Sequence, residues 1–302
     1  MLLPDRYEMA VQILPQELRR MALELPDCDK DRAEELRLRA GQPMTVLLPE
    51  GERAVGESAV QQVQLEQILN QAAEYSRYAY IESISHGYLC VRGGFRLGIC
   101  GTGVEFEGKN HDMKDISSLC LRILREKIGA AERVAPLLTE QGRFQSTLLL
   151  SPPGGGKTTL LRDLIRIVSS GTESLPAHRT AIVDERGEIA ACWHGEPQMA
   201  VGTHTDVLSG CGKAIGIPMV LRTMNPQLIA VDEITEQQDI RLMTQCANCG
   251  VALLATIHAA DREELRKKPL YPLLRESGIF RRLVIIRCRG GERSCAVENF
   301  DA

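Results

Sequence analysis

Residues 147–162 read TLLLSPPGGGKTTLLR, and this stretch decides the fold. Residues 147–150 form a short apolar run that predicts a buried strand, and residues 151–156 form a turn of serine, proline and glycine. Apolar residues then recur at helical spacing from Leu160 to Val168. A strand, a glycine-rich loop and a helix in this order are the context of a phosphate-binding loop.

The residue types in this loop suit a nucleotide. The three glycines have no side chains, so their backbone N–H groups can close around a phosphate, and the helix N-terminus adds partial positive charge. Lys157 supplies a point charge for the outer phosphates, and Thr158 supplies a hydroxyl for Mg2+. The predicted nucleotide contacts in the loop are Pro153, Gly154, Gly155, Gly156, Lys157, Thr158 and Thr159.

The loop departs from the usual GxxxxGK[ST] pattern at its first position. Ser151 stands where that pattern has glycine. A small residue that leaves a buried strand is still compatible with the turn. The alternative is a glycine-rich turn that happens to precede a lysine, and the flanking strand and helix favour nucleotide binding instead.

The composition is that of a soluble globular protein, and 302 residues are enough for two domains. The net charge of -4 gives no general attraction to nucleic acid. The N-terminal stretch MLLPDRYEMA is not typical of a secretory signal, and no apolar segment is long enough to span a bilayer. We therefore predict a cytoplasmic protein that reaches a membrane only through a partner.

Ten cysteines are scattered through apolar surroundings, as at Cys90, Cys100, Cys120 and Cys288. In a cytoplasmic protein this distribution predicts small buried apolar residues rather than disulfides. Cys246 and Cys249 form a single CxxC pair, with no second pair and no histidine at ligand spacing. The pair is therefore weak support for a zinc site.

Residues 1–130 are predicted to form a separate, smaller α+β domain. Apolar residues recur at helical spacing over residues 6–25, where Pro15 is predicted to start a second helix. They recur at the same spacing over residues 63–80. The predicted strands are two hairpins, over residues 35–39 with 43–48 and 87–91 with 95–102, and one further strand over 118–125. Residues 129–136 are predicted to be a linker or a short helix into the second domain.

Three arginines of this half are unusually placed. Arg92 and Arg96 flank the double glycine of VRGGFRLGICG, and Arg122 lies inside the apolar strand SLCLRIL. One interpretation is that they point to solvent from sheet edges. The other is that some of them reach the phosphates of a nucleotide from a neighbouring domain or subunit, because arginine is costly to bury without an anionic partner.

Residues 131–302 alternate strand and helix patterns, which predicts a mainly parallel sheet with helices on its faces. Three apolar runs, over residues 180–183, 228–231 and 251–257, predict further strands. The first is followed by Asp184, Glu185 and Glu188, the second by Asp232 and Glu233, and the third by His258. Carboxyl ends of parallel strands share the edge where ligands bind, so these side chains are predicted to face the phosphate loop.

The chemistry of these residues suggests specific roles. Asp232 is predicted to join the Mg2+ shell through water, and Glu233 to orient or polarise the attacking water. His258 is predicted to sense the terminal phosphate. Asp232 and Glu233 could instead cap the next helix, and His258 could be a satisfied histidine at a strand end.

The order of four motifs, SPPGGGKTT, IVDERGE, LRTMNPQLIAVDEI and TIHA, resembles the secretion and type IV pilus ATPases. GGFRLGICG, the strand with Arg122, TDVL, GKAIGIPM and RTMNP resemble more closely the stage III sporulation AA family of endospore-forming bacteria. The resemblance covers nearly the whole chain. It implies an α/β fold with a RecA-like P-loop ATPase domain and a parallel-rich sheet, preceded by a smaller α+β N-terminal domain.

The resemblance also implies site roles and cofactors, namely ATP and Mg2+. It implies Lys157 and Thr158 at phosphate and magnesium, Glu233 as the catalytic carboxylate and His258 as the reporter of nucleotide state. Asp184, Glu185 and Glu188 become an acidic box, and Arg92, Arg96 or Arg122 contacts the phosphates. The chain departs from the secretion ATPases at Asp232, where glycine is common, and at Thr235, where glycine or arginine is frequent.

The family implies an assembly as well. Its members are similar to ATPases that form hexameric rings in the cytoplasm and dock on membrane channel components. Here that implies a homo-oligomer on the stage III sporulation complex, in the mother cell, with no membrane span of its own.

Three rival functions stay open. A nucleic-acid-binding ATPase is disfavoured by the acidic balance and the few aromatic residues. A small-molecule kinase needs an arginine-rich lid, whereas residues 195–218 are mostly glycine and small residues. A nucleotide-gated scaffold would bind ATP without turnover.

Overall fold

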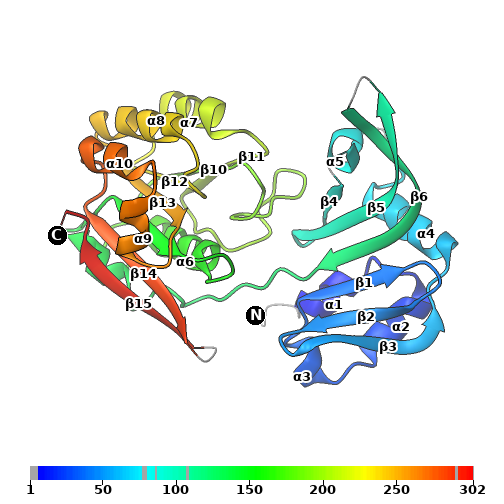
Figure 1. Cartoon of the computed structure of the whole chain (residues 1–302). Coiled ribbons are helices and arrows are strands. Elements are labelled where there is room, and N and C mark those ends of the chain that lie inside the picture. Colours follow the sequence, from blue (N-terminus) through cyan, green and yellow to red (C-terminus); the bar gives the residue numbers. More distant parts are fainter. Residues whose placement is uncertain (1–5, 77–79, 86, 107–108, 290–291, 302) are drawn as a thin grey trace. The chain divides into compact units, whose positions relative to one another are not determined.

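The computed structural model describes residues 6–76, 80–85, 87–106, 109–289 and 292–301. It contains two compact units, Met1–Arg125 and Glu126–Ala302, which are described separately (Figure 1). The predicted domain boundary, residue 130, falls in the turns that follow Arg125. No helix within these described ranges is long and apolar enough to cross a membrane.

The first unit is a six-stranded sheet with helices against it. The strand order is β3-β2-β1-β6-β5-β4, and every neighbouring pair is antiparallel. Its elements are α1 (Arg6–Val11), α2 (Gln16–Leu23), α3 (Asp27–Lys30), β1 (Glu35–Arg39), β2 (Pro43–Leu48), β3 (Gly51–Ala59), α4 (Gln62–Ala72), α5 (Ile81–Ser85), β4 (Tyr88–Val91), β5 (Phe95–Phe106) and β6 (Lys109–Arg122).

One face of this sheet carries the core of the unit. Buried and partly exposed residues alternate along β1 and β2, as a strand with one covered face requires. Leu36 and Leu38 on β1 are fully buried and join Leu14 and Leu18 from the helical segment in one apolar cluster. The opposite face carries charged residues, among them Glu35 and two of the arginines singled out in the sequence, Arg96 and Arg122.

Two predicted elements of this unit end at other residues than expected. The helix predicted over 63–80 ends at Ala72, because Glu74 and Tyr75 adopt left-handed φ values of 48 and 60°, which a helix cannot continue. Residues 77–79 of that prediction lie outside the described residues. The strand predicted over 118–125 ends at Arg122 but begins at Lys109, since β6 also pairs with the end of β5 through the polar stretch KNHDMKD, which carries no apolar alternation.

The prediction that the cysteines are buried is wrong for most of them. All ten lie in described parts of the chain, and Cys246 alone is buried, while Cys100 and Cys288 are exposed. Cys90 and Cys100 alternate with buried residues on strands whose outer face is open to solvent. Apolar neighbours in sequence therefore lie on the other face of the strand and do not bury the thiol.

The second unit contains a seven-stranded sheet of order β11-β10-β12-β13-β9-β14-β15. All neighbouring pairs are parallel except the antiparallel pair β14 and β15. Its elements are η2 (Ala135–Leu138), β7 (Thr139–Glu140), β8 (Arg143–Phe144), β9 (Thr147–Ser151), α6 (Lys157–Ser170), β10 (Thr180–Asp184), β11 (Thr205–Ser209), α7 (Lys213–Thr223), β12 (Leu228–Val231), α8 (Gln237–Asn248), β13 (Ala252–His258), α9 (Arg262–Lys267), α10 (Tyr271–Ser277), β14 (Arg282–Arg289) and β15 (Glu292–Asn299).

The central strands of this sheet are buried on both faces. Every residue of β9, β10 and β12 is buried. One apolar cluster joins the sheet to α7, α8 and α10, and the other joins it to α6 and η2 (Figure 1). Helices that cover both faces of a mostly parallel sheet define an α/β architecture, so the predicted α/β class with a parallel-rich sheet is confirmed.

Candidate functional site

The loop between β9 and α6 contains three glycines, and two different physical reasons require them. Gly154 and Gly156 have left-handed φ values of 72 and 95°, which residues with a Cβ rarely adopt. Gly155 has no such φ, but a Cβ there would lie 1.6 Å from Ser151 Oγ. Ser151, at the position of the missing first glycine, thus packs directly against Gly155. The α6 helix begins one residue after Gly156, at Lys157.

Lys157 is buried at the mouth of this loop. Its Nζ donates to the carbonyl oxygens of Ser151, at 3.0 Å, and Pro152, at 3.2 Å, and it lies 2.7 Å from His258 Nδ1. Because an ammonium group only donates, Nδ1 must accept, which places the imidazole proton on Nε2. Burial lowers the pKa of Lys157, and the charges of Asp232 and Glu233 partly oppose that shift.

His258 connects the lysine to a carboxylate. Its Nε2 lies 3.4 Å from Glu233 Oε1, and the other oxygen of Glu233 lies 3.4 Å from Arg186 Nη1. Lys157, His258, Glu233 and Arg186 therefore form one chain of polar contacts. His258 reaches this position because β13 pairs with β9 in a register that sets His258 beside Ser151.

Asp232 is held by two hydroxyl groups. Thr158 Oγ1 lies 3.4 Å from Asp232 Oδ2, and Thr256 Oγ1 donates to Oδ1 at 2.9 Å. The carboxylate and the Thr158 hydroxyl are hard oxygen ligands of the kind that Mg2+ prefers. Among the described residues, no cluster of three or more His, Cys, Asp or Glu side chains could hold a metal. This donor set fits Mg2+, which keeps several waters and is bound by one or two protein groups together with phosphate oxygens.

The acidic residues at the end of β10 and after it lie in different environments. Asp184 is 1% exposed, and its two oxygens accept the backbone N–H groups of residues 188–190. Burial raises the pKa of Asp184, and these hydrogen bonds oppose the shift. Glu185 lies 3.3 Å from Lys213 Nζ, which also donates to the Glu233 carbonyl at 2.8 Å. Asp184 is thus a positioning residue for the turn, whereas Glu188 reaches the cavity beside the loop.

A cavity of about 330 Å³ brings the loop and the carboxylates together. Its lining contains ten of the predicted site residues and three that the sequence did not single out. The lining residues are Pro153, Gly154, Gly156, Lys157, Thr158, Thr159, Arg186, Glu188, Asp232, Glu233, Thr256, His258 and Arg293. Gly155, Asp184 and Glu185 do not line it.

The three additional residues differ in the signal that could have found them. Arg186 lies inside the quoted motif IVDERGE, and Thr256 lies two residues before His258 on a strand, hence on the same face. Either could have been predicted from its position. Arg293 lies on β15, a polar edge strand with no motif in its sequence.

The predicted phosphate-contacting arginines belong to the first unit. Arg96 and Arg122 lie opposite each other on β5 and β6. The Arg96 guanidinium lies 3.8 Å from the centroid of the Tyr88 ring, and Arg122 Nε lies 3.4 Å from Glu35 Oε1. Arg92 is exposed beyond the end of β4. Their contact with a nucleotide stays a prediction.

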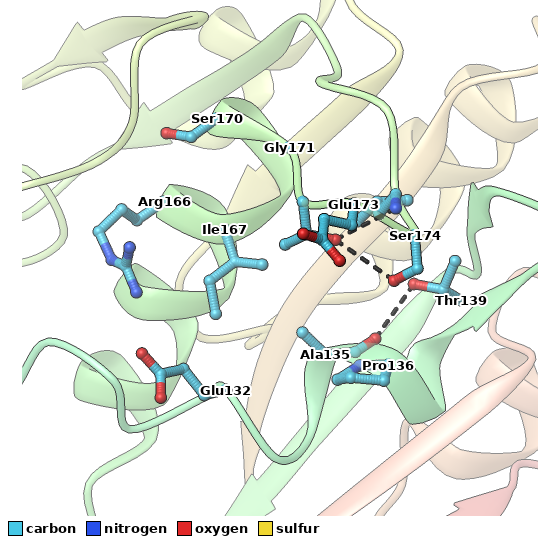
Figure 2. Close-up of a pocket in the computed structure, with 12 residues that line it drawn as sticks. Glu132, Ala135, Pro136, Thr139, Arg166, Ile167, Ser170, Gly171, Glu173 and Ser174 are labelled. Carbon is cyan, nitrogen blue, oxygen red and sulfur yellow. Dashed lines mark hydrogen bonds between the residues drawn. The ribbon is translucent and has the colours of Figure 1, made fainter.

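A second cavity, of about 390 Å³, lies at the other end of α6 (Figure 2). It is lined by η2, by the last turn of α6 and by the loop over residues 171–175. In Figure 2 the side chains of Arg166 and Glu132 point toward one another at one side of this cavity. None of the predicted site residues lines it, so size alone does not locate the chemistry in this unit.

Solved structures resemble this chain across both units. The ATPase DotB of Legionella pneumophila has a TM-score of 0.61 at 15% identity, covering 94% of this chain and 80% of its own. The pilus retraction motor PilT, solved with bound ADP, has a TM-score of 0.63 at 18% identity, covering 93% and 81%. These likenesses show the fold and confirm the predicted RecA-like P-loop class.

Sequence relatives show the family. The model of the family "Sporulation stage III, protein AA" matches residues 4–296. The stage III sporulation protein AA of Bacillus subtilis (strain 168) is 35% identical over 280 residues, 92% of this chain and 91% of the relative. A plant protein, SEEDLING PLASTID DEVELOPMENT 1 of Arabidopsis thaliana, is 28% identical over 179 residues, 55% of this chain and 23% of its own length. The chain therefore belongs to the sporulation stage III, protein AA family.

Proposed function

We propose that this chain hydrolyses ATP as a ring-forming motor of the secretion-ATPase type. One observation carries the proposal: a glycine-rich phosphate loop and the carboxylate of Glu233, which follows a different strand, line the same cavity. The likeness in fold to a pilus retraction motor with bound ADP supports it. Membership of the sporulation family supports a place for the motor in the mother cell, at the channel to the forespore.

The binding part of the site follows from the loop. Its backbone N–H groups and the α6 N-terminus would hold the phosphates, with Lys157 on the outer ones. Thr158 and Asp232 would hold Mg2+, which supplies charge neutralisation at the phosphate oxygens. Lys157 must then exchange its present acceptors for phosphate oxygens. The carbonyl oxygens are neutral, whereas phosphate oxygens carry a charge opposite to that of the ammonium group, so this exchange is favourable.

The hydrolytic part follows from Glu233. Its carboxylate faces the cavity and is oriented by His258 on one side and Arg186 on the other. In this position it orients a water for attack on the terminal phosphate and accepts a proton as the water adds. His258 contacts both Lys157 and Glu233, so it links the occupancy of the phosphate site to the carboxylate that activates water.

Two substitutions test this assignment. Lys157→Ala is expected to abolish nucleotide binding, and Glu233→Gln is expected to retain binding but to lower ATP turnover by at least a hundredfold, because the amide cannot accept the proton. Glu263→Gln, on the exposed surface of α9, is the matched control and should hydrolyse like the wild type. Equal turnover in Glu233→Gln and Glu263→Gln would remove Glu233 from the mechanism, and binding without any turnover in the wild type would favour the scaffold function.

The ring is tested separately. Sizing of the purified protein, with and without a nonhydrolysable ATP analogue, should show an oligomer that forms or tightens with the analogue. The expected mass is that of a hexamer. A monomer under both conditions would refute the ring while leaving the hydrolytic assignment to the substitutions above.

A further inference from the structure

Arg293 enters the nucleotide cavity from a part of the chain remote from every predicted motif. It lies on β15, in the hairpin that ends the sheet, and its side chain lines the cavity beside the phosphate loop. A Cβ placed on Gly156 would lie 3.1 Å from Arg293 Nε and 3.4 Å from its Cζ. The guanidinium group therefore lies directly against the last glycine of the loop.

The strand order tells which side of the loop Arg293 occupies. β13 and β12 lie on one side of β9, and they deliver His258 and the carboxylates of Asp232 and Glu233. β14 and β15 lie on the other side of β9. Arg293 thus approaches the loop from the side opposite to the catalytic carboxylate.

The charges in the cavity also distinguish Arg293. Lys157 is engaged by His258 and two carbonyl oxygens, and Arg186 faces Glu233. Within the ranges that the structure describes, no carboxylate pairs with Arg293. Its charge is therefore available to an anion at the loop without the rupture of an ion pair.

We infer that Arg293 binds the phosphate nearest the nucleoside, across the loop from the hydrolytic residues. The inference rests on the proposed function, since it concerns the same nucleotide. The loop N–H groups hold the inner phosphates and the lysine reaches the outer ones. A cation on the side away from Glu233 consequently meets the inner end of the triphosphate, which ADP and ATP share. Arg293 is then a binding residue within the chain that carries the loop, in contrast to arginines supplied by the first unit.

Arg293→Ala tests this with ADP and a nonhydrolysable ATP analogue. Loss of a charge-assisted hydrogen bond is expected to raise both dissociation constants by the same factor, about tenfold. Arg293→Lys should recover part of the affinity, because it keeps the charge but not the planar fork. Arg287→Ala, exposed on β14 and outside the cavity lining, is the matched control and should bind like the wild type.

The outcomes separate this inference from the function on which it rests. A loss confined to the ATP analogue would overturn it, since it would place Arg293 at the terminal phosphate. Affinity of Arg293→Ala equal to that of Arg287→Ala would overturn it too, while leaving the wild-type ATPase intact. If the wild type bound neither nucleotide, the proposed function itself would fail. Equal melting temperatures of the variants without nucleotide would show that a loss reports binding and not unfolding.

Discussion

The contact between Gly155 and Ser151 predicts how the loop after β9 accommodates serine at the first position of the pattern, where glycine is usual. The change is Gly155→Ala. The φ of Gly155 is not left-handed, so alanine introduces no backbone strain and its whole cost is steric. The new Cβ would lie 1.6 Å from Ser151 Oγ, 3.0 Å from Ser151 Cβ and 3.1 Å from the Pro152 oxygen.

The magnitude follows from what must move. Ser151 is fully buried, and its hydroxyl donates to the Pro152 carbonyl at 3.0 Å. Rotating this hydroxyl away breaks the bond inside the protein, which costs about 1–3 kcal/mol. The remaining overpacking against Cβ and the carbonyl costs about 1–3 kcal/mol. We expect Gly155→Ala to lower the free energy of unfolding of the second unit by about 3 kcal/mol, and Ser151→Ala in the same chain to recover about half of that loss, since only the Oγ contact is removed.

The chain carries its own reporter for this measurement. Its single tryptophan, Trp193, lies in the second unit, so urea unfolding followed by tryptophan fluorescence reports on that unit. Ser151→Ala alone completes the double-mutant cycle. The reasoning is refuted if Gly155→Ala unfolds at the wild-type urea concentration, or if adding Ser151→Ala brings no recovery.

Two further predictions use other parts of the second unit. Asp184→Asn places an amide donor against backbone N–H groups and should cost about 2–4 kcal/mol by the same urea assay. Burial raises the pKa of Asp184 in the folded state, so protonation of this carboxyl group favours folding. That stabilisation is fully present below the unfolded pKa and is lost as pH rises through the folded pKa. Asp184→Asn should lose this pH dependence of the free energy of unfolding, and an unchanged pH profile would contradict this. At pH 8, iodoacetamide should label exposed Cys249 and leave Cys246 unlabelled, because burial raises the pKa of Cys246 to about 11; equal labelling by mass spectrometry would be evidence against that burial.

The central parallel strands could be predicted closely from sequence. The strand predicted over 228–231 matches β12, and those predicted over 180–183 and 251–257 differ from β10 and β13 by one residue at their ends. These strands are buried on both faces, so each is a continuous apolar run bounded by polar residues. The same geometry explains why Glu233 and His258 could be placed at one sheet edge, where the cavity indeed gathers them.

The edges of both sheets could not be predicted in the same way. β11 and β15 are edge strands that each pair with a single neighbour. They contain mostly partly exposed or polar residues, so no apolar run indicates them in the sequence. Arg293 was missed for this reason. In the first unit, β5 and β6 extend beyond their apolar parts through backbone pairing alone, which sequence periodicity does not reveal. The exposure of the cysteines has a related cause, because their apolar neighbours in sequence lie on the opposite face of the strand and do not bury the thiol.

The geometry of the candidate site depends most on one strand, β13. Thr256 and His258 are two residues apart, so they project from the same face of that strand. Thr256 donates to Asp232, and His258 lies between Lys157 and Glu233. The residues proposed to bind Mg2+ and those proposed to activate water are therefore aligned by the same backbone pairing of β13 with its neighbours. A shift of that strand by one residue would turn both side chains to the opposite face. The contact of the Thr256 hydroxyl with Asp232 and the contacts of the His258 imidazole with Lys157 and Glu233 therefore depend on the same strand register.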